Sequence, residues 1–115
     1  MSMHVNSFLQ NCDLNITKEE IISSMTLETY LELAVKKFPA QFQLIGQEFI
    51  SLDGYEAGAT TVEFTLPSGS GKQILYTIKN GAMIWNVTFS TGVDEFEQRL
   101  PVFEQSIKTF KILIP

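Results

Sequence analysis

The chain has 115 residues, a net charge of −5 at pH 7, 44% hydrophobic and 18% charged residues. This length is that of one ordinary domain, so we expect a single domain over residues 1–115. Its apolar content can form a core without disulfides or metals, which excludes a disulfide scaffold and a disordered chain.

The eight Lys and Arg residues are scattered, and only Lys36 and Lys37 adjoin. Net negative charge repels a polyanion, and no polybasic run could hold an anionic lipid surface. Nucleic acid and membrane insertion are therefore not expected. No stretch reaches 18 apolar residues, and residues 1–4 do not begin an export signal. We expect a soluble chain, cytoplasmic, or in an envelope or thylakoid lumen if a signal was removed.

The N-terminal third predicts a strand and then helical structure. Alternation over residues 3–10 indicates one strand. Thr17–Glu20 has the spacing of a capping box, which predicts a helical turn that enters Ile21. Thr26 can cap a second helix, because apolar residues recur at helical spacing over 27–38 and a proline then ends the pattern.

Residues 42–90 change to a period of two, typical of strands. Turn signals divide this stretch into a four-stranded antiparallel meander; they lie at Asp53-Gly54, at Pro67–Gly71 and at Asn80-Gly81. One face of the sheet is strongly apolar. Leu75 and Ile84 lie on the other face, so we expect helices on both faces of a central sheet, an α+β architecture.

The last helical pattern runs from Val93 to Phe110, with acidic residues at its start. Pro101 predicts that a first turn ends near Arg99 and that the main helix begins at the proline. Residues 112–114 form an apolar tail. The periodicity of the strands and of this helix predicts one shared core: Phe64, Trp85, Val87, Phe89, Phe103 and Ile107.

No residue pattern predicts a catalytic, cofactor-binding or metal site. His4 is the only histidine and Cys12 the only cysteine, too few for a triad or a zinc site. Gly69–Lys72 lacks the spacing of a phosphate loop and is interpreted as a hairpin loop. The carboxylates of residues 94–97 are explained by the start of a helix. Two aromatic residues near element ends, Phe42 and Tyr55, are the predicted partner contacts.

Three short strings resemble the PsbP-like superfamily, which includes PsbP, DcrB-like proteins and Mog-type Ran-binding proteins: Met25–Leu31, Leu52–Ala57 and Phe103–Ile112. In the last of these, Thr109 stands where the family usually has serine. The resemblance covers about residues 3–112. It implies an α/β/α sandwich and non-enzymatic work: docking to photosystem subunits, binding a small GTPase, chaperoning hydrophobic segments or serving as an envelope lipoprotein domain. It transfers no catalytic residue and no metal ligand.

Members of that superfamily usually have further strands before the one that residues 3–10 would match. We therefore expect an open sheet edge, and with it a homodimer or a partner peptide added as a strand, unless residues 3–10 or the tail 112–114 cover it. The first functional hypothesis is a non-catalytic protein-binding or assembly module. The alternative is a small-ligand binder or enzyme with a curved-sheet cone. A pocket lined by Tyr30, Tyr76 or Trp85, with a buried carboxylate, would favour that alternative.

Overall fold

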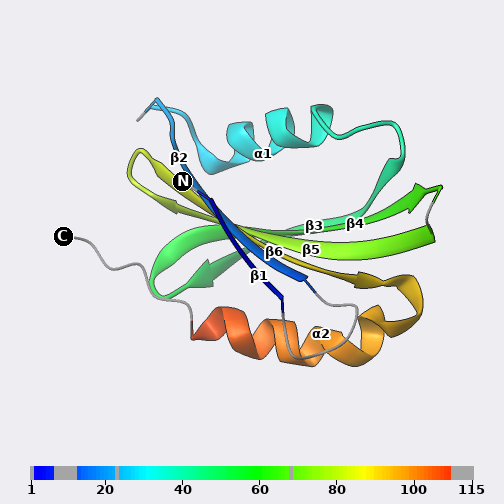
Figure 1. The fold of residues 1–115 in the computed structure, drawn as a ribbon. Coiled ribbons are helices and arrows are strands. Elements are labelled where there is room, and N and C mark those ends of the chain that lie inside the picture. Colours follow the sequence, from blue (N-terminus) through cyan, green and yellow to red (C-terminus); the bar gives the residue numbers. More distant parts are fainter. Residues whose placement is uncertain (1, 7–12, 23, 68, 110–115) are drawn as a thin grey trace.

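The computed structural model describes residues 2–6, 13–22, 24–67 and 69–109. These residues form six strands and two helices, in the order β1 (Ser2–Asn6), β2 (Asp13–Glu20), α1 (Leu27–Lys36), β3 (Phe42–Leu52), β4 (Tyr55–Leu66), β5 (Gly69–Asn80), β6 (Met83–Gly92) and α2 (Val93–Lys108). All six strands belong to one antiparallel sheet with the order β1-β2-β6-β5-β4-β3. Helix α1 covers one face and α2 the other (Figure 1). The predicted α+β sandwich is confirmed.

Strand β2 lies where a helical turn was predicted, so the capping-box interpretation of Thr17 is wrong. Thr17 pairs with Asn86 of β6, and on its other side β2 pairs with β1. Leu14 and Ile16 pack against the main core, so two neighbouring strands and one buried face outweigh a local capping signal. The predicted cap at Thr26 is confirmed, because its Oγ1 accepts a hydrogen bond from the Thr29 backbone N at 3.1 Å. The predicted N-terminal strand is β1, and residues 7–10 lie outside the described residues.

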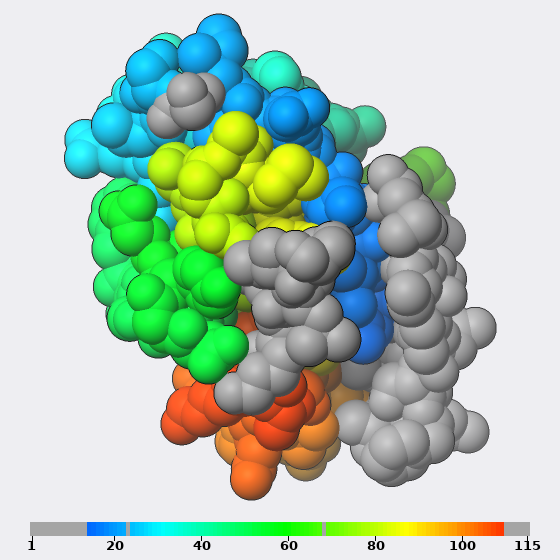
Figure 2. Space-filling view, turned by 90° about the vertical axis from the view of Figure 1, so that its left-hand side faces the viewer, coloured from blue at the N-terminus to red at the C-terminus, as the bar shows by residue number. Residues whose placement is uncertain are grey.

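The four predicted meander strands are β3 to β6, and two-residue turns join β3 to β4 and β5 to β6. Figure 2 views the end of the sheet where the β3–β4 turn (green) and the β5–β6 turn (yellow) lie side by side. Asp53 and Gly54 both have positive φ, as a tight hairpin turn requires. Gly69–Lys72 is not a loop, contrary to the prediction, but the start of β5. A Cβ at Gly71 would collide with the Phe64 ring, so glycine here makes room for an aromatic side chain on the neighbouring strand.

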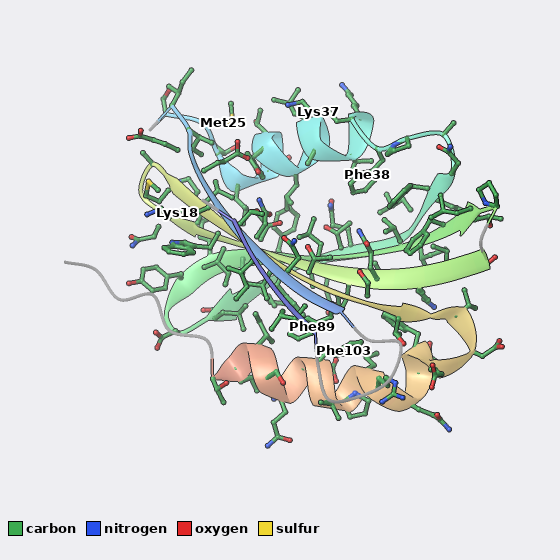
Figure 3. All side chains as sticks on the ribbon, viewed as in Figure 1. Lys18, Met25, Lys37, Phe38, Phe89 and Phe103 are labelled. Atoms are coloured by element: carbon green, nitrogen blue, oxygen red, sulfur yellow. The ribbon has the colours of Figure 1, made fainter. Side chains whose placement is uncertain are left out.

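The main core lies between the sheet and α2. It contains the alternating apolar residues of β5 and β6 and three side chains of the helix: Ile74, Tyr76, Ile78, Val87, Phe89, Phe96, Phe103 and Ile107. The rings of Phe89 and Phe103 stack with centroids 4.8 Å apart, and Figure 3 shows them pointing toward each other. Trp85 is half-buried against this core. Phe64 does not join it, contrary to the prediction, because it faces the α1 side, where its ring stacks on Phe42 at 5.1 Å.

Helix α2 is continuous through Pro101, so the predicted break near Arg99 is wrong. Pro101 and Glu97, the residue four positions before it, are both exposed, so the proline lies on the solvent-facing side of the helix. Phe96 and Phe103 lie on either side of the proline and are both buried in the main core. Packing on that core therefore holds the two halves in one helix.

The α1 side has a smaller core: Leu27, Leu31 and Ile84 are buried together, with Ile21 and Tyr30 packed against them. A hydrogen-bonded chain supplements this core. Thr77 Oγ1 donates to Asn86 Oδ1 at 2.9 Å, and Asn86 Nδ2 donates to Tyr30 Oη at 3.1 Å. The Tyr30 hydroxyl in turn donates to the Glu19 carboxylate. Helix α1 is thus connected to β2, β5 and β6 through polar side chains as well as apolar ones.

Candidate binding surface

Strand β3 is an edge of the sheet, because it pairs with β4 alone within the described part of the chain. Three of its apolar side chains are exposed: Leu44 at 43%, Ile45 at 44% and Phe49 at 58%. An edge strand of eleven residues with a single charged residue, Glu48, has little of the charge that usually protects such an edge. We call Leu44, Ile45 and Phe49 the β3 stripe.

The two faces of β3 differ in what they contact. Phe49 pairs with Gly58 and Leu44 with Val62, positions on the α1 side of the sheet. The pairing register shifts between Leu44 and Gly46, so Ile45 is an additional residue in a bulge. The alternate residues Glu48 and Ile50 lie on the α2 side. A strand added to β3 would therefore place its side chains alternately on the two sides.

On the α2 side, β3 forms one wall of a groove of about 300 Å³. Its floor is apolar, and charged side chains lie at its rim; the lining includes Glu48, Ile50, Ala59, Ile74, Tyr76, Glu104, Ile107 and Lys108. A smaller cavity of about 190 Å³ shares Glu48, Ala59 and Ile74 with it and continues along β3. We call the larger one the Tyr76 groove. It lies toward the C-terminal end of α2.

Tyr76 is the polar group at the floor of this groove. The residue is 3% exposed, and no other described residue makes a hydrogen bond to its hydroxyl. Burial, and to a lesser extent the negative charges of the nearby Glu104 and Glu48 carboxylates, raises the pKa of Tyr76 to about 12. The phenol therefore stays neutral at physiological pH and faces a region of negative potential.

A second groove, of about 370 Å³, borders α1, where Figure 3 labels Met25, Lys37 and Phe38. Tyr30 lines it beside Glu19, and burial together with the Glu19 carboxylate raises the pKa of Tyr30 to about 12. Both grooves thus have a tyrosine and the volume of a small ligand. Their carboxylates are exposed, so the buried acid that would favour an enzyme is absent from both grooves as described.

The predicted contacts Phe42 and Tyr55 lie at opposite ends of the β3–β4 pair and do not come together. Phe42 is half-buried, with its ring near Phe38 at 5.9 Å and Phe64 at 5.1 Å. Tyr55 is half-buried against the main core. Their role toward a partner stays a prediction. The β3 stripe was missed, although the adjacent Leu44 and Ile45, which interrupt the alternation, were a signal of the bulge.

Two carboxylates near the start of α2 have basic partners. At the start of α2, Glu95 pairs with Arg99 at 3.0 Å, and Glu97 lies 3.6 Å from Lys72. Within the described ranges, no group of three or more His, Cys, Asp or Glu residues is placed to hold a metal ion. None of the described helices has the length and apolar character needed to cross a membrane.

No protein-family model matches this sequence, and no curated protein matches it significantly. Solved structures do match. Protein PA94 of Pseudomonas aeruginosa, of unknown function, has a TM-score of 0.78 and 15% identity, over 100% of this chain and 83% of its own. Cyanobacterial PsbP (CyanoP) of Synechocystis has a TM-score of 0.70 and 14% identity, over 97% and 82%. The fold is PsbP-like.

A third PsbP-like structure is LpqN of Mycobacterium tuberculosis, a protein involved in cell envelope biogenesis. It has a TM-score of 0.62 and 15% identity, over 96% of this chain and 68% of its own. The expected resemblance is therefore confirmed at the level of the fold. The cone fold is excluded, because here strands come first and a long helix comes last. At these identities the fold alone is shared, and function has to be argued from the surface.

Proposed function

We propose that this PsbP-like chain is a non-catalytic protein-binding module that takes up an extended segment of a partner protein along the free edge of β3. The observation that carries the proposal is the β3 stripe: three exposed apolar side chains on an edge strand with one charged residue. An extended segment can pair with the unpaired backbone groups of such a strand, while its alternate side chains contact the apolar ones.

The chemistry of the stripe defines the partner segment. Side chains of an added strand that lie on the α1 side would contact Phe49 and Leu44, so apolar residues are favoured there. The net charge of −5 opposes pairing between two copies of this chain and favours a neutral or basic partner. The partner is therefore an extended segment with apolar residues at alternate positions.

The test uses the peptide acetyl-Val-Thr-Val-Lys-Val-Thr-amide and amide shifts of the labelled protein. We expect shifts concentrated on β3, and a binding constant that is about tenfold weaker in Phe49→Lys, since a large apolar contact is lost. The matched control is Val102→Lys, because Val102 is an apolar residue of α2 that is 46% exposed and lies outside β3. That variant should bind as the parent does.

Two results would contradict the proposal. The first is a peptide that leaves the β3 amides unchanged at millimolar concentration, or that shifts them equally in both variants. The second comes from sedimentation of the chain alone: a dimer at micromolar concentration that Phe49→Lys dissociates would assign this edge to a second copy instead of a partner.

A further inference from the structure

We infer that the Tyr76 groove receives a lysine or arginine side chain of the segment that pairs with β3. This inference rests on the proposed function and names the sequence feature that the partner carries. Residues directly opposite each other in paired strands point to the same side of the sheet. Glu48 and Ile50 both line the groove, so a side chain opposite either of them points toward its opening.

The groove combines apolar walls with carboxylates beyond them, as a long basic side chain requires. Its walls include Ile50, Ile74 and Ile107, which would contact the methylene groups of the stem. Beyond them, the carboxylates of Glu48 and Glu104 lie close enough to Tyr76 to raise its pKa. A cationic end group would be attracted by both carboxylates.

Tyr76 adds a polar group to the lining of the groove, and no described residue makes a hydrogen bond to its hydroxyl. Its oxygen can accept a hydrogen bond from an ammonium or guanidinium group, which are donors only. An incoming anion would instead face Glu48 and Glu104. Lys108 also lines the groove, and two carboxylates with one ammonium leave a net negative charge.

A small probe tests the groove separately from the strand edge. n-Butylguanidinium has the stem and the charge of an arginine side chain, and n-butanol has a similar stem without charge. We expect the cation to shift the resonances of the Tyr76 ring and of the Ile74 and Ile107 methyl groups, with a binding constant in the millimolar range. n-Butanol should bind several-fold more weakly than the cation. Added salt should weaken the binding of n-butylguanidinium but not that of n-butanol.

The charge contribution is isolated by two double variants. Glu48→Gln with Glu104→Gln should weaken n-butylguanidinium binding roughly fivefold, the effect of two exposed carboxylates. Glu28→Gln with Glu32→Gln removes the same charge from exposed positions of α1 and should have little effect. Equal binding of cation and alcohol, or equal weakening in both double variants, would overturn the inference.

The hexapeptide separates this inference from the proposed function. Replacing its lysine by norleucine should weaken peptide binding to the parent protein a few-fold, much as the Glu48→Gln, Glu104→Gln double variant weakens n-butylguanidinium binding. The same replacement should have a much smaller effect on binding to that double variant. If the norleucine peptide still shifts the β3 amide resonances and binds the parent protein as tightly as the lysine peptide does, the groove inference is wrong, but strand addition to β3 still holds. A peptide that never contacts β3, while n-butylguanidinium still enters the groove, removes the proposed function and with it the source of the basic side chain.

Discussion

The side chain of Leu31 lies directly on the backbone of Gly58: a Cβ at Gly58 would be 2.5 Å from Leu31 Cδ1. This contact brings α1 onto β4. Because Leu31 is 2% exposed and belongs to the small core, it cannot move without disturbing the other residues of that core.

Gly58→Ala should therefore destabilise the protein by about 1–3 kcal/mol, the usual cost of adding atoms to a packed site. Gly46→Ala is the matched control, since a Cβ there meets nothing within 4 Å. Urea denaturation of the two variants measures the difference. Equal midpoints would show that α1 does not depend on this contact.

Phe103→Ala should cost about 3–5 kcal/mol, because the ring is 1% exposed and stacks on Phe89 in the main core. Trp85→Ala should cost less, because Trp85 is half-buried at the edge of that core with Lys18 over its ring. Thermal or urea unfolding gives both values. A tryptophan variant that is the more destabilised of the two would contradict this assignment of the core.

Pro101→Ala should stabilise the protein by roughly 1–3 kcal/mol, since alanine restores a helical N–H donor toward Glu97 and removes the poorest helix former. Glycine at the same position should give a smaller gain. Calorimetry compares the three proteins. A loss of stability in the alanine variant would mean that the proline makes a contact that α2 needs.

Alkaline conditions should reduce stability through two tyrosines, the buried Tyr76 and the half-buried Tyr30. Burial raises the pKa of both Tyr30 and Tyr76 to about 12, whereas the unfolded chain ionises near the ordinary value of 10. The stabilisation is complete below pH 10 and is lost as the pH rises from about 10 to about 12. Between pH 9.5 and 11, the Tyr76→Phe variant should therefore lose less stability than the parent protein. The urea midpoints of both proteins at the two pH values measure this difference. An unchanged pH dependence would contradict the burial of the neutral phenol.

Local patterns predicted most of the fold, because periodicity reports which face of an element is buried. The cap at Thr26 and the turn at Asp53-Gly54 are both determined by neighbouring residues, and both were predicted. Strand β2 was not, since Leu14 and Ile16 give a short alternation and its pairing with β6 depends on residues far along the chain. The continuous α2 depends likewise on packing on both sides of Pro101.

The binding surface was harder to predict, because it depends on the order of the strands. Phe49 is exposed since β3 is an edge, and the amino acids of β3 do not encode that position by themselves. Tyr76 was singled out as a residue that a ligand pocket would contain. Its neighbours Glu48 and Glu104 come from β3 and α2, which only the tertiary structure brings together.

The pairing of β2 with β6 also determines when the sheet can be completed. Asp13 pairs with Ser90, so β2 leaves the ribosome long before its neighbour exists, while β3 to β6 can join one hairpin at a time as they emerge. During synthesis the apolar residues of β2 therefore stay without their partner strand until β6 has been made. β1 and β2 should therefore be the last strands to join the sheet, and they add to its free edge at β6.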